Sequence, residues 1–447
     1  MRKTSLALLT QSAPGPEPLG QIRPDATTVL TAYAILLYIV PSDRRIASLG
    51  GAGSLASLLA MAALVWWGWH QINAPRSPIQ SPVRWERVAV VAFFGACLAS
   101  YAVSALTPLG ETDTSVADLG LIRIAALVGI LLVGSDGIVT VDRLLLLARR
   151  LSLLAAVYAS LGLVQFATGV SFIDTLQIPG LTVSSDLGIG IRSGFTRPAS
   201  TAVHPLEYSL VLTMILPISL ALAVHDRRQA ALSRWLPVVL ISTAAILSVT
   251  RSALLATAVV FLVLLPSWPI NIRKLMAVAG LGGGLLMYLA IPGMAGTIVS
   301  MFIDSDASVT SRTDSYDTAV SFISISPIFG RGFGTFLPSY RIIDNQYLLS
   351  TIEVGFIGLA ALLGLVFTSM VLPLKSSRSW HSQPMRGLGA ALFASMLAGS
   401  LILAFFDAFA FTQASGTLFM IAGLAGSYCN ISRINYPKVE STSRNDP

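Results

Sequence analysis

Long apolar runs, separated by short polar segments, make up most of the chain. Because a membrane-spanning helix needs about 20 mostly apolar residues, this pattern predicts about twelve spans, with soft boundaries where Gly and Ala are frequent. The predicted spans are residues 26–41, 46–69, 88–106, 119–134, 151–168, 205–224, 235–249, 252–267, 274–291, 347–372, 387–406 and 411–429. Only residues 248–252 offer a turn between the seventh and eighth spans, which predicts a tight hairpin. The pattern therefore predicts an all-α integral membrane protein.

Composition indicates the same class. Of the 447 residues, 54% are hydrophobic and 11% are charged, whereas a soluble globular domain carries roughly a quarter charged residues. An aqueous core cannot hide this much apolar surface, so the bilayer must be the solvent for much of the chain. The two cysteines, Cys97 and Cys429, lie in apolar runs without the spacing of a metal site or a disulfide. We expect no metal site.

The distribution of Lys and Arg gives the predicted spans a direction. With the N-terminus inside, inner loops and tails hold twenty of the 29 basic residues, outer segments hold eight, and Arg123 lies within a span. Since short cytoplasmic loops are enriched in Lys and Arg, we expect both termini in the cytoplasm. Residues 1–24 and 431–447 are the predicted tails of a single membrane domain, residues 25–430. No basic block interleaved with aromatic residues points to nucleic acid.

Two predicted outer segments are long, about residues 169–204 and 292–346, whereas the inner loops are short. Both outer segments are polar and carry their own arginines and aspartates, so chemistry is expected there. In the second segment, residues 298–303 and 316–329 are apolar at helical spacing, which predicts short helices packed against the membrane surface.

Arginines in the predicted outer segments are unexpected, because the charge bias places most Lys and Arg residues inside. A guanidinium matches phosphate and carboxylate oxygens bidentately. Arg192 and Arg197 lie among glycines that let backbone amides approach a ligand, and His204 follows as the only histidine on the predicted outer face. His204 is either a polar side chain satisfied at the interface or a group that binds substrate or transfers a proton. Arg251, in the tight turn, either extends to lipid headgroups or contacts an anion at the membrane–water boundary.

Glu207 and Glu353 lie a few residues inside the outer ends of predicted spans, where a carboxylate in contact with lipid is costly. We expect both to face the protein or a wet cavity and to orient arginines as salt-bridge partners.

The stretch richest in candidate groups runs from Arg312 to the pair Asp344–Asn345, where the chain re-enters the membrane, and includes Arg331 in a Gly-rich turn. The Gly330–Gly334 run follows no strand and is not a nucleotide-binding fingerprint. Asp344 is a candidate general base or a ligand for sugar hydroxyls. The alternative is that it caps the N-terminus of the next helix, as Asp and Asn often do.

In order and spacing, these features resemble the bacterial O-antigen ligase/polymerase superfamily of membrane glycosyltransferases. The resemblance covers about residues 192–359, and no single motif in it is specific. The matching pieces are Ser-Val-Thr-Arg251-Ser, Arg312, Ser326-Pro-Ile-Phe-Gly330, Gly332-Phe-Gly334, Asp344-Asn345-Gln-Tyr-Leu348 and Glu353-Val-Gly-Phe-Ile-Gly-Leu359.

The resemblance implies a fold similar to the GT-C class, in the bacterial cytoplasmic membrane. It implies transfer of a glycan from an undecaprenyl diphosphate carrier, at the outer face, to an acceptor glycan or glycolipid, without metal, nucleotide or other cofactor. It leaves open an association with other polysaccharide-export components.

In the site that the resemblance implies, Arg251 and Arg312 engage the diphosphate. Arg192 and Arg197 are further candidates for the same anion. Asp344 takes the place of the base that deprotonates the acceptor hydroxyl in an inverting displacement. The residues expected to support the site are His204, Asn345, Glu207, Glu353 and Arg331.

The chain departs from the family pattern at Asp344, where ligases usually have His. An Asp-Asn pair is similar to polymerase-like and exopolysaccharide members, but the polymerases' Arg-x10-Gly spacing is absent, because Val203 and Tyr208 lie eleven residues after Arg192 and Arg197. Polymerase and ligase therefore both stay open.

The rival class is a transporter or flippase of lipid-linked glycan, which about twelve spans also suit. Transporters concentrate charges and broken helices near the bilayer midplane, often with internal repeats. This sequence shows no clear repeat and gathers charge on one side, which favours an enzyme. A non-catalytic scaffold would leave the outer arginines unexplained.

Overall fold

The computed structural model describes residues 25–73, 83–106, 111–171, 173, 175–183, 190–192, 195–227, 230–248, 250–290 and 307–435. The predicted tail 1–24 lies outside the described part, and so do residues 291–306 and 436–447. The side chains of Arg192 and Arg312 also lie outside it, although the backbone of each is placed. Residues 431–435 of the predicted tail 431–447 instead belong to the last helix of the described chain.

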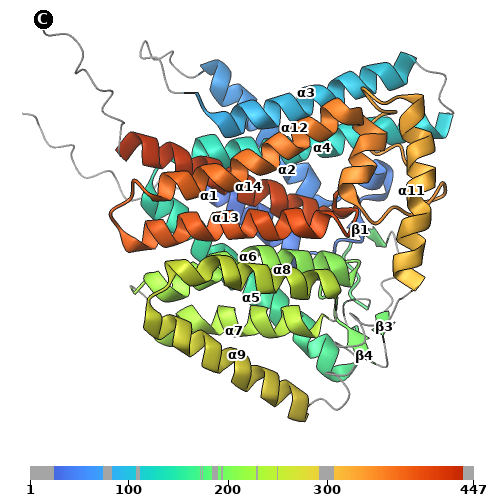
Figure 1. Ribbon diagram of the computed structural model, residues 1–447. Helices are drawn as coiled ribbons and strands as arrows, with labels where there is room; N and C mark the ends of the chain where they lie inside the picture. Colours follow the sequence, from blue (N-terminus) through green and yellow to red (C-terminus); the bar gives the residue numbers. More distant parts are fainter. Residues whose placement is uncertain are drawn as a thin grey trace, which may run out of the picture.

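Helices make up most of the described chain (Figure 1). They are α1 (Ala26–Ile39), α2 (Leu55–Asn73), α3 (Trp85–Leu106), α4 (Glu111–Gly137), α5 (Val141–Thr168), α6 (Pro205–His225), α7 (Ala231–Leu247), α8 (Arg251–Leu264), α9 (Ile270–Ala290), α11 (Ala307–Ile325), α12 (Gln346–Ser377), α13 (Gln383–Leu403) and α14 (Thr412–Asn435). Short strands are β1 (Arg44–Arg45), β2 (Thr182–Val183), β3 (Gly190–Arg192) and β4 (Phe195–Arg197).

A helix lies at each of the twelve predicted spans, which confirms an all-α, multi-pass membrane protein. Within the described residues, 7 helices are long and apolar enough to cross a membrane, namely α2, α3, α4, α5, α6, α12 and α13. The helices α1, α7 and α8 are apolar but shorter, so the number of crossings stays a prediction. The predicted tight hairpin is present, because α7 ends at Leu247 and α8 begins at Arg251.

The helix at the second predicted span, residues 46–69, begins later than predicted. Residues 47–52 form a short 3-10 segment, and α2 begins only at Leu55. Gly50 has φ 51°, a left-handed conformation that a regular helix cannot contain. The glycines at 50, 51 and 53 therefore delay the helix.

The core of the bundle is built around α6 and α14, whose residues are almost all buried. A helix that is apolar around its whole circumference has no solvent face and belongs inside. Close packing at this core depends on small residues: the Cβ of any larger residue at Gly134 of α4 would lie only 3.0 Å from Cα of Gly423 on α14.

One end of the bundle carries most of the non-helical structure. Figure 1 shows α11 crossing this end beside the strands. We call it the α11 end, defined by β1–β4, α11 and residues 326–345. There β3 pairs with β4 as a short antiparallel hairpin within the 169–204 loop, and β2 of the same loop pairs antiparallel with β1, which lies far away in the sequence. In the described part of the 292–346 loop, residues 307–346, the helix α11 has 19 residues and overlaps the short helix predicted at 316–329. The helix predicted at 298–303 lies outside the described residues.

Arg44 anchors the first of these loops to the bundle. Its side chain is buried, with Nη1 2.6 Å from Oδ2 of Asp43, and Nη2 donates to the carbonyl oxygen of Leu176 at 2.9 Å. A buried guanidinium needs such partners, which explains why this outer arginine is structural.

Candidate functional site

The α11 end is organised by a break in α12. At Gly355 the backbone leaves the helical region, with φ 68° and ψ −175°. The amides of Phe356 and Ile357, freed from helical bonding, donate to the carbonyls of Pro327 and Ile328 at 2.9 and 3.3 Å. A Cβ at Gly355 would overlap the carbonyl of Ile328. Only glycine fits this position.

The Gly-rich turn docks onto the same break. The amides of Arg331 and Gly332 donate to the carbonyls of Ile352 and Glu353 at 3.2 and 2.9 Å. Gly330 has φ 70°, and a Cβ there would overlap the backbone of Glu353. The glycines of this run therefore serve a backbone-to-backbone contact with α12, which agrees with its failure to match a nucleotide fingerprint.

Glu353 lies at the centre of this contact. Its side chain is 4% exposed, and its Oε1 accepts from the amide of Phe336 at 3.4 Å. The hydroxyl of Ser100 on α3 donates to the Glu353 carbonyl at 2.7 Å and accepts from the amide of Gly332 at 3.1 Å. The charges of Arg123 and Arg331 act on the carboxylate. The expectation that Glu353 faces the protein is confirmed.

Aromatic rings hold Arg331. Its guanidinium carbon lies 5.2 Å from the ring centre of Phe322 on α11 and 4.9 Å from that of Tyr340. Cation–π contacts of this kind orient a guanidinium without neutralising it. Arg331 therefore links α11 to the Gly-rich turn while keeping its charge at this end of the molecule.

Asp344 and Asn345 have different environments. Asn345 is the N-cap of α12, and its Oδ1 accepts from the amides of Tyr347 and Leu348 at 3.0 and 3.1 Å. The capping role considered for Asp344 thus belongs to its neighbour. Asp344 is half-buried and lies close enough to Asp407 for the two carboxylates to repel each other.

Asp407, between α13 and α14, was not among the residues that the sequence singled out. Burial, together with the nearby Asp344, raises the pKa of Asp407 to about 7. Near neutral pH the Asp407 carboxyl is therefore protonated part of the time. The sequence did contain one sign of this residue, because Asp407 stands alone between two long apolar runs, next to Phe406 and Ala408. A carboxylate at such a place is costly and often functional.

The loop that holds Asp407 also reaches α12 and His204. The amide of Phe409 donates to Oε1 of Gln346 at 2.8 Å, and the Phe411 ring centre lies 6.1 Å from that of His204. His204 is the N-cap of α6, and its Nδ1 accepts from the amide of Leu206 at 3.1 Å. Burial and the nearby Arg197 lower the pKa of His204 to about 4. The imidazole is therefore neutral at pH 7 and carries its proton on Nε2.

Glu207 is buried, and its carboxylate accepts hydrogen bonds from two backbone amides and a hydroxyl, whereas we expected a salt bridge with an arginine. Its Oε1 accepts from the amide of Gln413 at 2.7 Å, and its Oε2 accepts from the amide of Val203 at 3.0 Å and from the hydroxyl of Ser42 at 3.3 Å. Glu207 thus fixes the start of α14 and the loop before α6. Its role near the site is positional.

The predicted anion ligands are spread around the α11 end. Arg251 is the first residue of α8 and is partly exposed, and Arg197 lies on β4 near His204. Arg192 lies on β3 and Arg312 on α11, with side chains outside the described part. Their convergence on one diphosphate stays a prediction.

One family model matches a part of the chain that contains several of the candidate residues. Residues 236–363 match the model of the O-antigen ligase family. The resemblance to the O-antigen ligase/polymerase superfamily is confirmed. The matched segment runs from α7 to the middle of α12 and includes Arg251, Arg312, Arg331, Asp344 and Glu353. No curated protein matches the chain.

Proposed function

We propose that this protein transfers a glycan from an undecaprenyl diphosphate carrier to an acceptor glycan or glycolipid at the outer face of the cytoplasmic membrane, as a polymerase or ligase. The observation that carries the proposal is the O-antigen ligase match, because it spans the segment that contains Asp344, Arg251 and Arg312.

The proposed reaction is a single displacement with inversion, on a GT-C-like scaffold. The acceptor hydroxyl oxygen forms a bond to the anomeric carbon of the donor, and the bond from that carbon to the diphosphate oxygen breaks. Asp344 takes the hydroxyl proton. The leaving diphosphate gains negative charge, which Arg251 and Arg312, with Arg197 and Arg192, would stabilise as fixed cations.

Neutral His204, with its proton on Nε2, would donate a hydrogen bond to substrate and would not act as a cation. The Asp407 carboxyl beside Asp344 would help to place the proton that leaves the acceptor. Asn345, Glu207, Glu353 and Arg331 would position the catalytic groups through the cap, the loop and the α12 break described above.

The test compares Arg251→Ala and Arg312→Ala with Arg378→Ala, which removes an exposed arginine from the C-terminus of α12. We expect each of the first two to abolish growth of the surface glycan at unchanged protein level, and the third to have no effect. Normal glycan in both of the first two variants would contradict the proposal. In a deletion strain, accumulated single repeats on the carrier indicate a polymerase, and long unattached chains indicate a ligase.

A flippase of lipid-linked glycan is the second candidate, and the break in α12 at Gly355 favours it, because transporters build their sites from broken helices. The two functions differ in detergent. A transferase releases undecaprenyl diphosphate from a lipid-linked donor when acceptor is present, whereas a flippase needs a membrane and forms no new bond. Release of carrier diphosphate by purified protein in micelles supports the transferase, and its absence supports the flippase.

A further inference from the structure

A cavity of about 410 Å³ lies between α2, α3 and α4, at the end of the bundle opposite the α11 end. Trp66, Val88 and Val133 give it apolar walls, and Arg84 and Arg87 give it positive charge. It shares no residue with the candidate site. Nothing in the proposed transfer reaction uses these groups.

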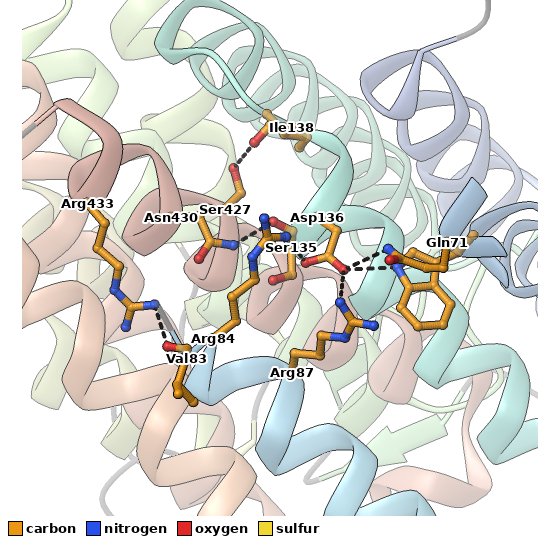
Figure 2. A network of polar contacts seen from close by, with 11 residues as sticks. Gln71, Val83, Arg84, Arg87, Ser135, Asp136, Ile138, Ser427, Asn430 and Arg433 are labelled. Carbon is orange, nitrogen blue, oxygen red and sulfur yellow. Dashed lines mark hydrogen bonds and ion pairs between the residues drawn. The ribbon is translucent and has the colours of Figure 1, made fainter. Parts of the chain in front are cut away.

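Asp136 is the centre of a converging polar network in this cavity (Figure 2). Arg84 Nη1 lies 2.7 Å from its Oδ1, and Arg87 Nη1 lies 3.7 Å from its Oδ2. Trp67 Nε1 donates to Oδ2 at 3.0 Å, and Gln71 Nε2 does so at 3.5 Å. One carboxylate therefore faces two arginines, and the network keeps an excess of positive charge.

The exposure of these groups decides which of them a ligand meets. The Asp136 side chain is 6% exposed, whereas the side chains of Arg84 and Arg87 are each 38% exposed. A guanidinium has five N–H donors. One carboxylate with two oxygens contacts both arginines but cannot engage all of their donors. The carboxylate is covered and the cationic groups are open to the cavity. An anion is the ligand that this arrangement fits.

The cavity is held in shape by α14. Arg433 Nη1 donates to the carbonyl of Val83 at 3.0 Å, and Asn430 Nδ2 donates to the carbonyl of Ser135 at 3.0 Å. Figure 2 shows both contacts on the same side of Asp136, with Gln71 on the other side. Arg87 also lies over the Trp67 ring, 5.0 Å from its centre. The arginines are thus positioned before any ligand binds.

The surroundings point to a lipid. Trp69 and Ile72 on α2 and Trp85 on α3 are 68%, 82% and 53% exposed. Exposed Trp residues at helix ends mark the boundary between membrane and water, and basic pockets between helices at such a boundary bind the headgroups of anionic lipids. Free phosphate would use the arginines but not the apolar walls.

We propose that this cavity binds the phosphate of an anionic phospholipid between Arg84 and Arg87, with the glycerol and first acyl carbons against Trp66 and Val88. The positive-inside pattern predicts that the lipid belongs to the cytoplasmic leaflet. The site is separate from the proposed transfer centre, so it stands if that function fails.

The experiment measures phospholipid binding to the purified full chain by native mass spectrometry in detergent, with phosphatidylglycerol and phosphatidylcholine as probes. We expect wild-type protein to retain one phosphatidylglycerol at least tenfold more strongly than phosphatidylcholine. Val88→Trp should remove this preference, because it fills the cavity while keeping every contact of Asp136. Arg87→Gln, which keeps the short Arg84–Asp136 pair, should weaken binding about tenfold.

The matched control is Arg378→Gln, an exposed arginine at the same end of the bundle but outside the cavity, and it should bind as wild type does. The proposal is overturned if Val88→Trp and Arg87→Gln bind as wild type does, or if Arg378→Gln loses as much binding as they do. It is also overturned if inorganic phosphate displaces the lipid at comparable concentration, because the site would then take a free anion.

Discussion

Neighbouring polar residues at the α11 end have separate physical roles, and their contacts distinguish them. Asn345 satisfies two amides of the first turn of α12, whereas Asp344 lies beside Asp407. Glu207 and Glu353 are both buried, and amides of distant loops hold them. At the residue scale, the polar groups thus divide into those that hold the backbone and the carboxylates of Asp344 and Asp407, which lie near each other.

Asp344→Asn and Asn345→Ala should separate these roles. We expect Asp344→Asn to lower transfer at least about 100-fold, the usual contribution of a general base, with unchanged thermal stability. Asn345→Ala should cost about 1 kcal/mol of stability through the lost cap and should lower transfer much less than Asp344→Asn does. Glycan assays measure transfer by the two variants, and melting curves measure their stability. Full transfer by Asp344→Asn would show that Asp344 is not the base.

His204 makes stability depend on pH. In the unfolded chain an imidazole binds a proton near pH 6.5, whereas in the folded protein the His204 pKa is about 4. Between these pH values the unfolded state binds more protons than the folded state does. The stability of the folded protein should therefore fall as the pH is lowered from about 6.5 to 4, and below pH 4 His204 should cause no further change. His204→Asn keeps a capping oxygen and should reduce this dependence in melting curves. An equal dependence in both proteins would contradict the assignment.

At the scale of elements, the break in α12 and the Gly-rich turn form one unit. Each supplies the hydrogen-bond partners that the other lacks, across Pro327–Gly332 and Ile352–Ile357. Buried backbone groups must be paired, and in a membrane the need is greater. The break therefore persists because the turn satisfies it, and both place Glu353 and Arg331 at the α11 end.

Gly355→Ala should disrupt this unit. The residue has φ 68°, and an added Cβ would overlap the Ile328 carbonyl, so we expect a loss of stability of at least about 1–3 kcal/mol and loss of transfer. Gly364→Ala is the matched control, because it lies in the same helix with open space around it. That control should be neutral or slightly stabilising. Melting temperatures in detergent compare the two, and equal values would contradict the argument.

For the whole molecule, the bundle has two chemically distinct ends. The α11 end holds the strands, the candidate site and the unit around Gly355, and the opposite end holds the Arg84–Arg87–Asp136 cavity and the ion pair of Arg149 with Asp226. The positive-inside pattern predicts that the first end faces outward. A carrier-linked glycan would then reach the site from the outer leaflet.

Labelling of single cysteines tests this orientation. Ser321→Cys lies on an exposed part of α11, and Arg378→Cys lies at the other end. The native Cys97 and Cys429 are buried and should not interfere. We expect a membrane-impermeant maleimide to label Ser321→Cys but not Arg378→Cys in intact spheroplasts. Labelling of only Arg378→Cys would show that the protein lies in the membrane in the orientation opposite to the predicted one.

The sequence by itself determined the helices, the bias of Lys and Arg and the resemblance to the O-antigen ligase/polymerase superfamily, because hydrophobic runs, charges and motif spacing are local properties. The glycine-delayed start of α2 and the length of α11 were missed, since the runs there are short or interrupted by polar residues.

Only the tertiary structure decided what the polar residues do. Asp407 meets Asp344, Gln413 meets Glu207 and Ser100 meets Glu353 across long separations in the chain, and no local pattern encodes such pairs. The Gly-rich run likewise acquired its role only through backbone contact with Ile352 and Glu353 of α12. Helix formation follows from nearby residues, whereas a site depends on which helix ends the folded bundle brings together.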